Sequence, residues 1–84
     1  MVKALGAFTV GIRLKQARLE RGLSRQQLAA AASVGTSTIQ NIEDGRGQPR
    51  NDTVEALARA LQVSPCWLGF GIGKRSDVLE KGDP

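Results

Sequence analysis

The stretch Leu23–Gly45, with the sequence LSRQQLAAAASVGTSTIQNIEDG, constrains the fold more than any other part of the chain. Ser24 can accept a hydrogen bond from an amide of a first helical turn, and Gln27 follows it at the spacing of a capping box. No helix breaker occurs in the eight residues after Ser24. A second helical pattern begins near residues 35–36 and stops before Gly45, which suits a left-handed helix end. The stretch therefore predicts two short helices with a tight break between them.

Two helices joined by about three or four residues form the helix-turn-helix layout, and the side chains divide as that layout requires. Ala29 is small at a position where the second helix must approach closely. The apolar side of the unit consists of Val34, Ile39 and Ile42. Because residues three and four apart are neighbours on a helix, the opposite face carries Thr36, Ser37, Gln40 and Asn41.

This opposite face is short, uncharged and rich in hydrogen-bonding groups. Gln and Asn side chains can bond bidentately to adenine in the major groove of DNA, and Ser and Thr can donate or accept there. Taken alone, the same pattern fits an ordinary solvated helix face equally well, because short motifs also occur by chance. The residues of this face therefore leave both interpretations open.

The stretch as a whole resembles the Xre/Cro family of phage and bacterial repressors. The match consists of the run LS-R-QQLA and then, without a gap, of Ala29, Val34, Ser37-Thr38-Ile39, Ile42-Glu43 and Gly45. It extends more loosely from about Val10 to Gly71. The resemblance implies an all-α, five-helix lambda-repressor-like domain whose second helix lies across the DNA backbone and whose third enters the major groove. The expected partner is double-stranded DNA, bound by a homodimer at a palindromic operator, and the expected function is transcriptional regulation, more often repression than activation.

The resemblance also implies roles for particular side chains. The base-reading candidates are those of the polar face: Thr36, Ser37, Gln40 and Asn41. Contacts to DNA phosphates are expected from the start of the second helix, from the third helix and from the loop after it: Ser24, Arg25, Thr38, Arg46, Gln48 and Arg50. Without the neighbouring motif, the loop arginines would be interpreted as solvated.

Arg18 lies on the apolar stripe of the first predicted helix, where a charged group needs a partner. In the resembling family, the arginine that matches Arg18 pairs with the glutamate that matches Glu43, so we expect a structural ion pair between the two. The alternative is an Arg18 whose charged end reaches solvent along the apolar surface.

Two residues depart from the usual pattern of this family. Ser33 stands where the family usually has glycine, because the backbone there is left-handed, and serine adopts that conformation only at a cost. Gly35 stands where the family often has a serine or threonine cap, for which glycine is a tolerable substitute. We therefore expect a positive φ at Ser33 and an unchanged fold.

The first helix is predicted to run from about Thr9, a candidate cap, to Arg21, with Gly22 as its left-handed end. Its inward face should carry the residues that recur at helical spacing: Val10, Leu14, Ala17 and Arg18. Residues 1–8 lack a strong pattern and are predicted to form an arm.

A fourth helix is predicted to start at Asn51 or Asp52, with Asp52 and Glu55 as a capping box. Its buried stripe should comprise Val54, Leu57, Ala58 and Leu61. Ser64-Pro65 then begins a short fifth helix with Cys66, Trp67 and Leu68. The glycine-rich residues 69–73 are predicted to leave that helix as an irregular segment, so the domain spans residues 9–73 and a polar tail or linker spans residues 74–84.

Composition limits the chemistry that this chain can perform. Its 84 residues suffice for one small domain. With a single cysteine, the chain cannot form an internal disulfide. Without histidine, it lacks the usual general base and the commonest metal ligand. We therefore expect no enzymatic activity, no metal and no other cofactor. No apolar run approaches the ~20 residues of a membrane span, and a cytoplasmic location is the default expectation.

The positive charge is concentrated in the half of the chain that contains the helix-turn-helix pattern. Residues 1–50 carry eight Lys/Arg against three Asp/Glu, a net charge of +5, whereas residues 51–84 carry four against five, a net charge of −1. A field of positive sign attracts a polyanion. An excess this small also fits solubility alone, so it supports DNA binding only together with the motif.

Two alternatives to a complete DNA-binding regulator remain open. An antitoxin-type or other protein-interaction module can use the same fold, and an additional apolar surface formed by Phe8, Phe70 and Ile72 would distinguish it. The chain can also be the DNA-binding part of a larger regulator, with residues 74–84 as its linker.

Overall fold

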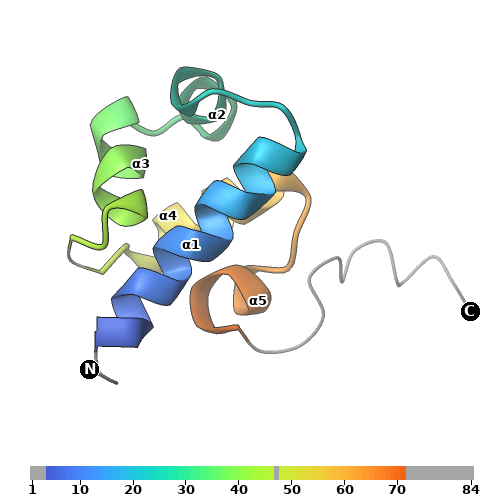
Figure 1. Ribbon diagram of the computed structural model, residues 1–84. Coiled ribbons are helices and arrows are strands. Elements are labelled where there is room, and N and C mark those ends of the chain that lie inside the picture. The colour runs from blue at the N-terminus through green and yellow to red at the C-terminus, as the bar shows by residue number, and fades with distance from the viewer. Residues whose placement is uncertain (1–3, 47, 72–84) are drawn as a thin grey trace, which may run out of the picture.

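The computed structural model describes residues 4–46 and 48–71, with side chains described from Val10 onward (Figure 1). These residues form the helices α1 (Ala4–Glu20), α2 (Arg25–Ala32), α3 (Thr36–Glu43), α4 (Asn51–Leu61) and α5 (Pro65–Phe70). No strand occurs within these two ranges, and the predicted all-α, five-helix class is confirmed. None of the described helices has the length and apolar character needed to span a lipid bilayer.

The five helices enclose one core through a closed ring of contacts. α1 packs against α3 and α5, α2 packs against α3 and α4, and α4 packs against α5. Each helix contributes at least one fully buried aliphatic side chain, and these are Leu14, Leu28, Ile39, Leu57, Leu61 and Leu68. In Figure 1, α2 and α3 lie on one side of the diagonal α1 and α5 lies on the other. The helix-turn-helix is therefore held from two directions, α3 by α1 and α2 by α4.

The start of α2 follows from local sequence. Ser24 Oγ accepts a hydrogen bond from the Gln27 amide at 3.0 Å, and Gln27 Oε1 accepts one from the Ser24 amide at 2.8 Å. The predicted capping box is thus confirmed. Ser64 caps α5 through a 3.3 Å bond from the Trp67 amide to its Oγ, with proline at the first helical position as predicted.

The turn between α2 and α3 confirms the left-handed backbone predicted at Ser33, which has φ 59° and ψ 42°. The Val34 amide donates to the Ala29 carbonyl at 3.0 Å and the Ser33 amide to the Ala30 carbonyl at 3.3 Å. This pair of bonds is a Schellman motif, which satisfies carbonyl groups at the end of α2. Gln62 ends α4 with the same backbone conformation, which the sequence analysis did not predict.

We expect Ser33→Gly to leave the stability unchanged or to raise it by up to about 1 kcal/mol. Glycine relieves the strain of a positive φ, although its greater freedom in the unfolded chain offsets part of the gain. Ala30→Gly, at an exposed position inside α2, is the control and should lose about 1 kcal/mol. Denaturant unfolding of both variants measures the difference. Equal losses at the two positions would contradict the strained turn.

The predicted start of α1 at Thr9 is wrong, because α1 begins at Ala4. Residues 4–8 of the predicted arm are therefore helical. They contain alanine and leucine, which favour helix, and no proline. The single Gly6 costs only about 1 kcal/mol in a helix, which is too little to stop α1. The predicted stop at the other end is confirmed, since Gly22 has φ 70°.

The predicted Asp52–Glu55 capping box is also wrong. α4 begins at Asn51, its capping residue is Arg50, and no side chain caps it. A capping side chain must stand before the first helical residue, whereas Asp52 lies inside the first turn. At that position its carboxylate still interacts favourably with the helix dipole. The end of α5 differs from the prediction as well, because the helix continues through Phe70. Ile72, Gly73 and residues 74–84 lie outside the described residues.

Arg13 of α1 and Arg21, the residue directly after α1, bind the carboxyl-terminal ends of α5 and α4. Arg21 Nε donates to the Leu61 carbonyl at 2.8 Å, and Arg13 Nε donates to the Leu68 carbonyl at 3.1 Å. The guanidinium of Arg13 also lies 6.0 Å from the centre of the Trp67 ring. Burial lowers the pKa of Arg13 from its usual value. These two positive charges are therefore used to join helices.

Candidate nucleic-acid interface

The polar face of α3 is exposed to solvent. The exposed side chains are Thr36, Ser37, Gln40 and Asn41, whereas Ile39 and Ile42 on the opposite side are buried. No acidic residue occurs in the first turn of α3, which Gly35 caps without a side chain. The four base-reading candidates thus share one accessible, uncharged surface of a helix that is anchored in the core.

A polar hollow of about 390 Å³ lies between α3, the loop after it and the start of α4. Its lining residues are Thr38, Asn41, Ile42, Arg46, Gln48, Pro49, Arg50 and Thr53. The hollow brings together Thr38, Arg46, Gln48 and Arg50, four of the six phosphate candidates, beside the base-reading candidate Asn41. Because two exposed guanidinium groups border it, the hollow suits a negatively charged partner.

Arg50 has a carboxylate neighbour within this region. Its Nε lies 3.5 Å from Asp52 Oδ1, and the two side chains are 83% and 71% exposed. An ion pair exposed to this degree contributes little free energy. Arg50 can therefore leave Asp52 for another anion at small cost.

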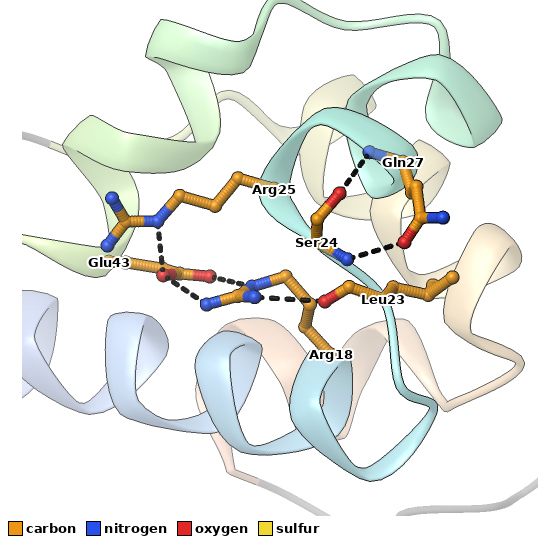
Figure 2. A network of polar contacts seen from close by, with 6 residues as sticks. All are labelled: Arg18, Leu23, Ser24, Arg25, Gln27 and Glu43. Atoms are coloured by element: carbon orange, nitrogen blue, oxygen red, sulfur yellow. Dashed lines mark hydrogen bonds and ion pairs between the residues drawn. The ribbon is translucent and has the colours of Figure 1, made fainter.

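The other two phosphate candidates, Ser24 and Arg25, stand at the start of α2, next to a network centred on Glu43 (Figure 2). Arg18 Nε lies 2.7 Å from Glu43 Oε2 and Arg18 Nη2 lies 3.1 Å from Glu43 Oε1, so the two residues form a bidentate ion pair. Arg25 Nε adds a bond of 3.0 Å to the same Oε1. Arg18 Nη1 donates to the Leu23 carbonyl at 3.0 Å. One carboxylate thus joins α1, α2 and the end of α3.

Gly11 sets how closely α1 approaches α3. A Cβ at this position would overlap the carbonyl oxygen of Ile42 and lie 3.0 Å from that of Glu43. Only glycine permits this approach, because any side chain would push the end of α3 away from α1. The position of the exposed face of α3 therefore depends on a residue of α1 that itself lies in the core.

The sequence analysis did not find three features of this region, namely the close approach at Gly11, the second ion pair of Glu43 and the shared hollow. A glycine inside a helical pattern is a signal for close packing, and it could have identified Gly11. No local sequence pattern predicts the second ion pair of Glu43 or the shared hollow, because each joins residues from elements that meet only in the folded chain.

The apolar candidates for a protein-interaction surface are described only in part. Phe70 is 70% exposed. The side chain of Phe8 and the whole of Ile72 lie outside the described residues. The exposed Phe70 adjoins a hollow of about 300 Å³ between the start of α4 and α5, which Val54 and Pro65 also line.

Comparison with known proteins agrees with this geometry. Residues 9–66 match the family model described as a helix-turn-helix domain. The chain is 44% identical over 61 residues to the HTH-type transcriptional regulator PrtR of Pseudomonas aeruginosa, and the match covers 73% of this chain and 23% of that protein. It is also 44% identical over 56 residues to the immunity repressor protein of Bacillus phage phi105, with 67% of this chain and 39% of that protein covered. The chain thus spans less than half the length of these two relatives.

A protein of known structure shares this fold over nearly the whole length of its own chain. The restriction-modification controller protein C.AhdI from Aeromonas hydrophila superposes with a TM-score of 0.71 at 29% sequence identity, and the match covers 74% of this chain and 94% of that one. The family model, the named relatives and the arrangement of α2 and α3 lead to one assignment. This chain belongs to the helix-turn-helix domain family, and within it to the Xre/Cro type.

Proposed function

We propose that this chain binds double-stranded DNA in a sequence-specific manner and regulates transcription, more often by repression than by activation. The observation that carries this proposal is the exposed, uncharged face of α3 beside a hollow bordered by arginines. Uncharged amide and hydroxyl groups read base edges, while arginines hold the phosphate backbone. The relatives named as a transcriptional regulator and an immunity repressor favour the same function. Such a regulator acts at the bacterial chromosome, in the cytoplasm.

In the proposed complex, α3 enters the major groove and the start of α2 faces the sugar–phosphate backbone. A homodimer on a palindromic operator follows from affinity, because one module of this size contacts few base pairs. Each protomer would then read one half-site, and the two half-sites would lie about one helical turn apart, near 10 base pairs.

Selection of bound sites from a random duplex pool tests this function directly. We expect enrichment of one palindromic sequence, with half-sites about one helical turn apart. Sedimentation of the purified chain with a selected duplex then gives the number of protomers bound. Retention of all sequences alike, or of none, would contradict the proposal.

Gln40→Ala and Asn41→Ala are each expected to relax discrimination at one or two base pairs by roughly 1–3 kcal/mol. Both side chains are exposed, so the free energy of unfolding should stay within about 0.5 kcal/mol of wild type. Affinities for all single-base variants of the selected site provide the measurement. Gln16→Ala, at an exposed position of α1, is the matched control. If both α3 variants discriminate like the control, another surface reads the bases.

Arg46→Ala and Arg50→Ala should each weaken binding to all duplexes to a similar extent. Each loss of a phosphate contact should reduce the slope of log affinity against log salt by about one. The control is Arg59→Ala, which makes the same change in net charge in the last turn of α4, whereas Arg50 precedes the first. An equal change of slope in Arg59→Ala would show that net charge alone is responsible.

A further inference from the structure

The Glu43 carboxylate forms ion pairs with two arginines, although one arginine would neutralise its charge. Its carboxylate already accepts two bonds from Arg18, and its side chain is 1% exposed. Arg18 is 8% exposed and is fixed further by the Leu23 carbonyl. With Arg25 included, the three side chains carry a net charge of +1. The second arginine therefore brings a positive charge beyond what the buried pair needs.

Arg25 differs from Arg18 in exposure and orientation. Its side chain is 36% exposed, and Arg25 is the first residue of α2. It bonds Glu43 through Nε, at 3.0 Å from Oε1. Figure 2 shows that Nε is the nitrogen bonded to the carboxylate and that the two terminal nitrogens lie at the other end of the guanidinium from Nε. The bond to Glu43 through Nε therefore does not use the two terminal nitrogens, and the side chain is partly open to solvent.

A guanidinium held in this way is prepared for a phosphate. Two terminal N–H groups can bind two phosphate oxygens in parallel, which is the strongest contact that arginine makes with that anion. A long side chain normally loses rotamer freedom when it binds, and that loss weakens affinity. Because Glu43 already restricts Arg25, less freedom remains to be lost.

We propose that Glu43 is a positioning residue that holds the Arg25 guanidinium ready for a phosphodiester of the DNA backbone. The buried acid thereby promotes DNA binding despite its negative charge. Its bidentate bond to Arg18 fixes the carboxylate, and the remaining bond of Oε1 fixes Arg25. This inference rests on the proposed DNA-binding function.

The sign of one substitution separates positioning from simple electrostatics. Glu43→Gln removes a negative charge near the DNA, so simple electrostatics predicts tighter binding. Positioning predicts the opposite, because a neutral amide with one acceptor oxygen cannot hold both arginines. A competitive role, in which Glu43 withholds Arg25 from phosphate, also predicts tighter binding. Weaker binding thus supports positioning against both alternatives.

The experiment is a double-mutant cycle for affinity to a mixed-sequence duplex of about two helical turns, measured over a range of salt concentrations. The variants are Arg25→Ala, Glu43→Gln and their combination, each verified as folded by circular dichroism at the assay temperature. We expect Arg25→Ala to weaken binding about tenfold and to reduce the salt slope by about one. Glu43→Gln should weaken binding about threefold to tenfold and have no further effect in the Arg25→Ala background.

Arg25→Lys provides a test that does not depend on the folding of Glu43→Gln. Lysine keeps the charge, but its single ammonium cannot bond Glu43 and also present a planar fork to phosphate. We expect it to recover less than half of the loss, on a logarithmic scale, caused by Arg25→Ala. Binding by Arg25→Lys equal to wild type, tighter binding by Glu43→Gln, or the same loss from Glu43→Gln in both backgrounds would overturn the positioning role. If wild type binds no duplex at all, the proposed function fails together with this inference.

Discussion

Glu43→Leu is expected to lower the free energy of unfolding by about 3–5 kcal/mol. The substitution removes the only carboxylate within salt-bridge distance of Arg18 in the described residues, and the Arg18 side chain is only 8% exposed. A buried charge without a partner retains its full cost of desolvation. Arg25, at 36% exposed, can turn to solvent and should add little to the loss. Urea unfolding followed by circular dichroism measures the effect.

Arg18→Met should cost less than Glu43→Leu, because Glu43 keeps Arg25 as a partner. This asymmetry is expected from the three-residue network, in which Glu43 contacts two arginines. The double variant Arg18→Met, Glu43→Leu should recover much of the larger loss, since apolar side chains of similar volume then replace the pair. Losses that add in the double variant would show that Arg18 and Glu43 do not stabilise each other.

Gly11→Ala is expected to lower the free energy of unfolding by about 3 kcal/mol, at the upper end of the usual cost of overpacking. The added methyl group would meet the backbone carbonyls of Ile42 and Glu43, which cannot move without shifting α3. Helix propensity alone predicts the opposite sign, a gain of about 1 kcal/mol for alanine over glycine. The two explanations are therefore separated by the direction of the change.

Gln16→Gly is the matched control for this prediction. Gln16 is exposed on the same helix, so its replacement by glycine measures the propensity term without a packing term. It should lose about 1 kcal/mol. If Gly11→Ala stabilises the protein by about the amount that Gln16→Gly destabilises it, α1 and α3 do not approach as closely as described. If the Gly11→Ala variant folds but binds DNA more weakly, the close approach of α1 and α3 is also required for DNA binding.

Several features of the fold could be predicted from the sequence because they depend on a few consecutive residues. The capping box of Ser24 and Gln27 joins residues three apart, and the left-handed backbone at Ser33 is set by the turn itself. Ser64 and Pro65 specify the start of α5 in the same local way. The buried faces of α3 and α4 follow from helical periodicity.

The starts of α1 and α4 were predicted wrongly, because the local sequence marks the first residue of each helix only weakly. Asp52 and Glu55 have the spacing of a capping box, yet α4 begins too early for Asp52 to act as the cap. Thr9 is an acceptable cap in isolation, but nothing before it prevents the helix from continuing back to Ala4. In both cases a helix extended because the added residues tolerate helical backbone, and a possible cap does not forbid helix before it.

The sequence by itself determined the helix-turn-helix, its exposed polar face and its family. Only the tertiary structure decided which positive charges remain for a partner. Arg13 of α1 binds the end of α5, Arg21 just after α1 binds the end of α4, and Arg25 shares Glu43 with Arg18. The physical reason is that a long guanidinium side chain bonds whichever carbonyl or carboxylate the packing brings within its reach. Those acceptors lie 18 to 55 residues away along the chain, so no local pattern marks them.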